Sequence, residues 1–174
     1  MKNRLRETWN SGKPALNGWL GIPSTFSAEI MSKQDFDSIT IDLQHGLTDY
    51  AIAVPMMQAM SASDATMLCR VPWLEAGIIM KLLDAGAMGI ICPMINSRKE
   101  AEEFVGATRY APLGYRSSGP VRAGLIYPDY HNQANDQIIS LAMIETEEAV
   151  TNAEEICATP GLTGIYVGPS DLAI

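Results

Sequence analysis

The chain has 174 residues, of which 47% are hydrophobic and 18% charged, and its formal net charge is -8 at pH 7. This is an ordinary globular composition, and the length is enough for one domain with a sizeable core. Basic residues are scattered, which argues against nucleic-acid binding. No apolar stretch approaches the roughly 18–20 residues of a membrane helix. The first residues, Met1–Arg6, lead into polar sequence without the apolar core of a signal peptide.

The three cysteines, Cys69, Cys92 and Cys157, form an odd set without CxxC spacing. Cys69 and Cys92 lie inside apolar runs and are expected to be buried as small hydrophobic residues. We therefore expect a reducing, cytoplasmic location.

Short apolar runs alternate along the chain with amphipathic stretches. The expected strands are Gly18–Ile22, Ser38–Leu43, Thr66–Val71, Gly89–Cys92, Ile138–Ile144 and Gly164–Val167. The expected helices are Ser27–Lys33, Tyr50–Ser61, Leu74–Ala85, Arg98–Thr108, Asp129–Asn135 and Glu147–Ala158. Continuous apolar strands separated by helices predict a parallel sheet buried on both faces. No linker or shift in composition divides the chain, so residues 1–174 are expected to form one α/β domain of six β/α units.

Six such units fit either a doubly wound sheet or part of a (β/α)8 TIM barrel. Polar residues from several strands gather at the C-terminal strand ends, which is typical of a barrel. The turn after the first strand, Gly21–Thr25, lacks the glycine fingerprint of a dinucleotide-binding sheet. A complete barrel takes about 250 residues. We therefore predict a barrel truncated to about its first six units, without strands seven and eight.

Two carboxylates, Glu145 and Asp171, follow two consecutive expected strands. Oxygen ligands on neighbouring strands suit a hard divalent cation such as Mg²⁺ or Mn²⁺, with Co²⁺ as a further candidate. The alternative is that both are caps or first-turn acids of the helices that follow. The glycine and proline before Asp171, together with the shared position of the pair, favour a metal site.

His45, one of only two histidines, closely follows Asp42 at the end of the second expected strand. An Asp42 carboxylate that accepts a hydrogen bond from one ring nitrogen would leave the other nitrogen as a base. A structural histidine at a strand–loop junction is the alternative.

Arg70 ends the third expected strand, where a cation is costly unless an anion accompanies it. A substrate carboxylate or enolate would provide that anion, and so would a structural ion pair with Asp42, Glu145 or Asp171. No lysine ends a strand, which favours metal-assisted chemistry over a Schiff base.

Asp84 stands at a helix C-terminus, where the dipole disfavours an acid, and this hints at a role beside the default of an exposed side chain. The Gly- and Pro-rich segment Gly114–Ala123 could place Arg116 or Arg122 over an anionic substrate. An ordinary connection is the alternative for most of that segment.

Taken in order, these pieces resemble the HpcH/HpaI aldolase family, the metal-dependent pyruvate aldolases related to citrate lyase β. The resemblance covers nearly the whole chain and rests on Gly18–Gly21, Ile41–Gly46, Arg70–Pro72, Leu82–Ala87, Pro93–Met94, Ala107–Arg116, Ile144–Thr146 and Val167–Leu172.

The resemblance implies a role for each residue of the expected rim. Glu145 and Asp171 would be the metal ligands, and His45 with Asp42 the acid–base dyad. Arg70 would stabilise a metal-bound pyruvate enolate. Gly168, Pro169 and Ser170 would hold the pyruvate carboxylate, Trp19 would border the aldehyde, and Asp84 would reach a neighbouring subunit's site in a homo-oligomer, commonly a hexamer.

The implied reaction is reversible cleavage of a 4-hydroxy-2-oxo acid to pyruvate and an aldehyde. Gln44 stands where many family members carry Glu, and Met143 where some carry Gln, and both differences bear on the substrate. Three alternatives stay open: a C–C lyase acting on a CoA thioester, a decarboxylase, and an inactive truncated scaffold.

Overall fold

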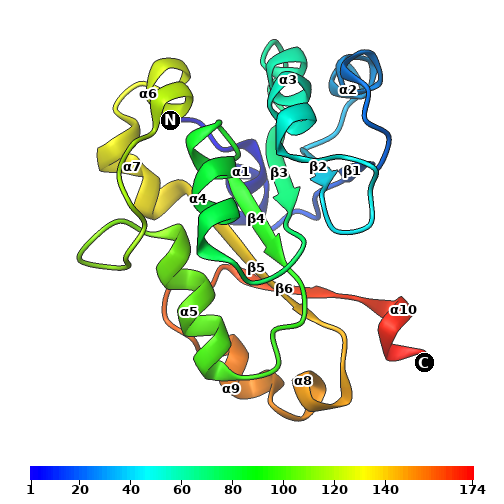
Figure 1. Cartoon of the computed structure of the whole chain (residues 1–174), viewed down its shortest axis with the longest axis vertical. Coiled ribbons are helices and arrows are strands. Elements are labelled where there is room, and N and C mark those ends of the chain that lie inside the picture. Colours follow the sequence, from blue (N-terminus) through cyan, green and yellow to red (C-terminus); the bar gives the residue numbers. More distant parts are fainter.

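The computed structural model describes all 174 residues and shows a parallel sheet covered by helices (Figure 1). The strands are β1 (Asn17–Leu20), β2 (Ser38–Asp42), β3 (Thr66–Arg70), β4 (Gly89–Cys92), β5 (Ile139–Ile144) and β6 (Gly164–Val167). The helices are α1 (Arg4–Asn10), α2 (Thr25–Ser32), α3 (Tyr50–Met60), α4 (Ala76–Asp84), α5 (Arg98–Thr108), α6 (Val121–Ile126), α7 (Tyr130–Gln137), α8 (Glu147–Thr151), α9 (Ala153–Cys157) and α10 (Pro169–Leu172).

The six strands are all parallel and lie in the order β1-β2-β3-β4-β5-β6. A doubly wound sheet would reverse its strand order at a switch point, and this sheet does not. The parallel α/β architecture and its winding in one direction were predicted correctly. The sheet also curls, since aromatic side chains from its two edge strands, Trp19 of β1 and Tyr166 of β6, contact each other.

The main core lies between the sheet and the surrounding helices, where 32 buried residues form one cluster. All residues of β2 and β4 are buried, as expected for parallel strands covered on both sides. Cys69 and Cys92 belong to this core, and burial raises the pKa of the Cys69 thiol to about 12, so it stays protonated. None of the helices has the length and apolar character needed to cross a membrane.

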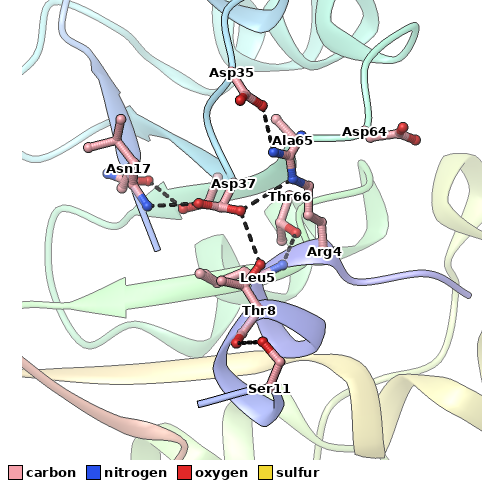
Figure 2. Close-up of polar contacts among 12 residues, drawn as sticks. Arg4, Leu5, Thr8, Ser11, Asn17, Asp35, Asp37, Asp64, Ala65 and Thr66 are labelled. Carbon is pink, nitrogen blue, oxygen red and sulfur yellow. Dashed lines mark hydrogen bonds and ion pairs between the residues drawn. The ribbon is translucent and has the colours of Figure 1, made fainter. Parts of the chain in front are cut away.

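The N-terminal helix α1 crosses the N-terminal ends of the strands. Its Leu5 packs on Leu68 and Ile139, which point into the curl of the sheet. Asp37, just before β2, accepts hydrogen bonds from Arg4 Nε (3.3 Å) and Thr8 Oγ1 (3.0 Å), as Figure 2 shows. The end of the curled sheet that lies opposite the C-terminal strand ends is therefore closed by α1.

The expected elements agree with the structure to within a few residues, and β4, β6 and α5 have the expected bounds. The expected helix Glu147–Ala158 is interrupted at Asn152, whose side chain donates to the Asn96 carbonyl at 2.8 Å. Asparagine favours such local bonding over a helix interior. Three short helices, α1, α6 and α10, were not predicted.

Candidate active site

Charged side chains from several strands meet at the C-terminal rim of the sheet. Asp42 ends β2 and Arg70 ends β3, and the strand register places these two residues side by side. Glu145 directly follows β5, and Asp171 lies in α10, just after β6. Because parallel strands end on one side, these residues share one rim, which is where barrel enzymes place their active sites.

The Asp42 carboxylate is the most heavily bonded group on this rim. It accepts hydrogen bonds from Arg70 Nε (2.9 Å) and Nη2 (2.5 Å), Trp19 Nε1 (3.3 Å), and the backbone N–H groups of Gln44 (3.0 Å) and His45 (3.3 Å). Burial alone would raise the pKa of Asp42, but the hydrogen bonds from Arg70, Gln44 and His45 outweigh it and lower the pKa. Asp42 is therefore an anion whose acceptor positions are all in use.

The contact between Asp42 and His45 differs from the expected one. Asp42 holds the backbone N–H of His45, whereas we expected it to accept a bond from the imidazole ring. The His45 side chain is exposed at the rim. Gly46 follows it because a Cβ there would collide with the carbonyl oxygen of Asp42. Asp42 thus shapes the loop that carries His45 and leaves the ring free.

Arg70 forms the ion pair with Asp42 that was the structural alternative for this residue. The pair is nearly buried, with 12% of the Arg70 side chain and 5% of the Asp42 side chain exposed. The guanidinium lies 4.9 Å above the ring of Trp19, which itself contacts Tyr166. The two bonds to Asp42 use Nε and Nη2, so the Nη1 edge of Arg70 remains available to an anion.

Glu145 is a buried carboxylate, 3% exposed, without a lysine or arginine in ion-pair contact. Its Oε1 accepts a hydrogen bond from the Met94 backbone at 2.7 Å, and Met94 adopts a φ of 56°. Its Oε2 lies against Gly168, where a Cβ would come within 2.6 Å. Glu145 does not cap the following helix, because that position belongs to Thr146.

Asp171 and the residues before it form a short exposed turn next to Glu145. Pro169 begins α10, a position that suits proline because its missing N–H needs no partner there. The Gly168 N–H donates to the Ile144 carbonyl at 3.1 Å, which ties this turn to the end of β5. Asp171 is exposed and makes no ion pair. No group of three or more His, Cys, Asp or Glu side chains is close enough together to hold a metal ion.

The structure does not bring Asp84 to this rim within the chain. Asp84 ends α4, which returns to the N-terminal side of the sheet before β4 begins. Its Oδ1 accepts a bond from Arg116 Nη2 at 2.6 Å, and the Arg116 side chain is fully buried against the rings of Tyr110 and Tyr130.

Arg116 and Arg122, which the Gly- and Pro-rich segment could have placed over an anionic substrate, do not lie over the rim of their own chain. Arg116 is committed to Asp84. Arg122 donates to the Ala85 carbonyl at 2.5 Å and to Ser61 Oγ at 2.7 Å, which places it near the end of α3. Both arginines hydrogen-bond to residues at the ends of outer helices, and neither reaches the strand ends.

Two residues of the rim were missed from the sequence. Tyr166 alternates with outward-facing neighbours in β6, and this pattern could have placed it on the inner face. Met94 contributes through its backbone, and nothing in the sequence predicts a methionine in the left-handed region.

The family model for HpcH/HpaI aldolase/citrate lyase matches residues 18–174. A hydroxypyruvate/pyruvate aldolase of Rhizorhabdus wittichii is 44% identical over 173 residues, which are 99% of this chain and 69% of that protein. A 4-hydroxy-2-oxo-heptane-1,7-dioate aldolase of Salmonella paratyphi C is 35% identical over 177 residues, covering 99% and 67%.

The fold agrees with this sequence similarity. The crystal structure of a HpcH/HpaI aldolase/citrate lyase family protein from Burkholderia cenocepacia superposes with a TM-score of 0.91 at 29% identity, over 99% of this chain and 71% of that one. The chain belongs to the HpcH/HpaI aldolase/citrate lyase family.

Proposed function

We propose that the protein is a metal-dependent class II pyruvate aldolase, an aldehyde-lyase that reversibly cleaves 4-hydroxy-2-oxo acids to pyruvate and an aldehyde. The observation that carries the proposal is Glu145, a buried carboxylate without a basic partner, on the same rim as the Asp42–Arg70 pair. A buried anion is costly unless a cation compensates it. The aldolases among the relatives support the same reaction class.

The residues present fit a hard divalent cation. Glu145 and Asp171 supply oxygen donors, and two carboxylates with open positions for water and substrate are typical of Mg²⁺ and Mn²⁺ sites, with Co²⁺ as a further candidate. Met94 fixes Glu145 through Oε1, which leaves Oε2 as the donor beside Gly168. A bound cation would act as a Lewis acid on the 2-oxo group.

The chain's own residues would bind the substrate and move its protons. The backbone around Gly168, Pro169 and Ser170 would hold the substrate carboxylate, and Trp19 would border the aldehyde side. His45 would take the proton of the 4-hydroxyl group, directly or through a water. The electron pair of that O–H bond then forms the aldehyde carbonyl as the C3–C4 bond breaks.

The electrons of the C3–C4 bond pass to the 2-oxo oxygen and create a negative charge there. Arg70 would stabilise this charge through its Nη1 edge, because Asp42 fixes its position and uses the other nitrogens. Returning the proton to C3 yields pyruvate. Asp42 would act through the positions of Arg70 and His45, as a positioning residue.

The proposal extends to the assembly. We take residues 1–174 as one incomplete TIM-barrel domain that a complete protein closes with two further β/α units, in a cytoplasmic homo-oligomer. Asp84 would act on a neighbouring subunit's site, since in its own subunit it lies at the other end of α4.

The test is pyruvate release from a panel of 4-hydroxy-2-oxo acids by the whole protein, after EDTA treatment and after return of Mg²⁺, Mn²⁺ or Co²⁺. We expect activity to disappear with EDTA and to return with metal. Equal rates in both conditions would refute the metal site. Release of CO₂ without aldehyde would indicate the decarboxylase alternative, and turnover of CoA thioesters alone would indicate the citrate lyase type.

A further inference from the structure

A pocket opens on the face opposite the candidate active site, at the N-terminal ends of β5 and β6. Its volume is about 530 Å³, within the range of pockets that hold metabolites. It lies between α1, the end of α5, the end of α7 and the turn before β6. The lining residues that matter here are Arg6, Arg109, Asn135, Asp136, Gly161 and Thr163.

Two arginines converge in this pocket on the same backbone carbonyl. Arg6 Nη2 donates to the Ile138 carbonyl at 2.9 Å, and Arg109 Nη2 donates to the same oxygen at 3.1 Å. Arg109 is only 4% exposed and also donates to Thr108 Oγ1 (2.8 Å) and the Gly161 carbonyl (3.1 Å). Arg6 donates in addition to the Gln137 carbonyl at 3.0 Å.

Neither arginine has an acidic partner in ion-pair contact. The acid beside them is Asp136, which also lines the pocket but is exposed. Neutral carbonyls and hydroxyls can satisfy guanidinium N–H groups without cancelling the charge. Two cations and one exposed acid leave the pocket locally positive, in a chain whose net charge is -8.

Each arginine also keeps unused donors. A guanidinium has five N–H groups. Arg109 makes three bonds in the structure, through Nη1 and Nη2. Arg6 makes three as well, through Nε and Nη2. Two N–H groups per side chain therefore have no protein acceptor, on residues that line the pocket.

The pKa values of Arg109 and Arg6 are both lowered in this arrangement. Burial first, and then the neighbouring charge of Arg6, lower the pKa of Arg109 to about 10, while Asp136 opposes the change. Burial likewise lowers the pKa of Arg6, again against Asp136. A cation pair held this way is stabilised by an anion that bonds to both guanidinium groups.

We propose that this pocket binds a small oxyanion, a phosphate or carboxylate group of a metabolite-sized ligand, between Arg6 and Arg109. The site is separate from the rim that carries Asp42 and Glu145, and it does not depend on the proposed aldolase reaction. The pocket adjoins the N-terminal ends of β5 and β6. Glu145 and Asp171 follow the C-terminal ends of these same two strands.

The test is isothermal titration calorimetry of the metal-free whole protein with inorganic phosphate and, separately, with succinate, at constant ionic strength. We expect one site per chain, with a dissociation constant of about 1 mM or lower for at least one probe. The probe that binds identifies which of the two oxyanions the site prefers.

Charge variants decide whether the binding belongs to this pocket. Arg6→Gln should weaken binding about tenfold through loss of a charge-assisted bond, and Asp136→Asn should tighten it about threefold through loss of a like charge. Lys33→Gln, an exposed charge elsewhere, should change nothing. Unchanged binding in a folded Arg6→Gln protein overturns the proposal, and so does a folded protein that binds neither probe. If Arg6→Gln does not fold, Asp136→Asn carries the test, and unchanged affinity in that variant overturns the proposal.

Discussion

Trp19 and Tyr166 lie on the two edge strands of the sheet, yet their ring centroids are 5.7 Å apart and their planes differ by 32°. This contact crosses the inside of the curled sheet and brings β1 and β6 together. The same indole donates to Asp42 at 3.3 Å and lies 4.9 Å beneath the Arg70 guanidinium. Trp19 therefore connects the curvature of the sheet to the charged pair on its rim.

Removing the indole should reduce stability. We expect Trp19→Ala to lower the free energy of unfolding by about 2–3 kcal/mol, since it loses packing, the contact with Arg70 and the bond to Asp42. Trp19→Phe keeps a ring and should cost only about 1 kcal/mol. Urea unfolding of both variants checks this, and equal losses would show that the ring contacts contribute nothing.

Because Gly168 contacts Glu145, adding one methyl group at Gly168 should weaken metal binding. In Gly168→Ala the new Cβ would lie 2.6 Å from Glu145 Oε2 and 2.8 Å from its Cβ, so the carboxylate must move. We expect the metal concentration for half-maximal aldolase activity to rise at least about tenfold, as for loss of a group that orients a metal ligand.

Gly164→Ala, at the start of β6, is the matched control. Its Cβ would make an ordinary contact of 3.6 Å with Leu141. Metal titration of pyruvate release should therefore separate the two variants. Identical metal dependence in Gly168→Ala and the wild-type protein would count against Glu145 as a ligand.

The strands and the long helices were predictable because their burial patterns are local. β4 and β6 are continuous apolar runs bounded by glycine and turn residues, and α5 begins at the Ser97 cap. The short helices were missed for a physical reason, since four to seven residues carry too little periodicity to distinguish them from loops.

The expected strand ends predicted which residues lie on the rim, but they did not predict which side chains those residues contact. The apolar run of β2 predicts that Asp42 lies at a strand end. That Asp42 bonds to the Arg70 side chain, and not to the His45 ring, depends on the register between β2 and β3. Arg116 was misplaced because its partner Asp84 lies 32 positions away. A buried pair between two distant segments leaves no local pattern in a single sequence.

The Asp84–Arg116 pair should be a strong stabilising contact of the outer layer. Asp84→Ala leaves the fully buried Arg116 side chain without its counter-charge, and breaking a buried pair in this way costs about 3–5 kcal/mol. The exposed pair Arg98–Glu102 provides the comparison, because Glu102→Ala should cost less than about 0.5 kcal/mol. Thermal or urea unfolding measures the loss of stability in both variants. Similar losses would contradict the assignment of Asp84–Arg116 as a strong stabilising pair.

The Asp42–Arg70 pair predicts how stability depends on pH. The pKa of Asp42 is lowered in the folded state, chiefly because the hydrogen bonds from Arg70 and Gln44 overcome the effect of burial. A lowered carboxyl pKa contributes stability that is complete above the unfolded pKa of about 4 and is lost as the pH falls through the folded value. The stability difference between the wild-type protein and Asp42→Asn should thus be constant from pH 7 to about 5 and shrink below about pH 4. Urea midpoints across this range measure it, with Asp64→Asn, an acid whose side chain is 75% exposed, as the control that should show little difference at any pH. A difference that stays constant down to pH 3 would mean that the charge of Asp42 does not stabilise the rim.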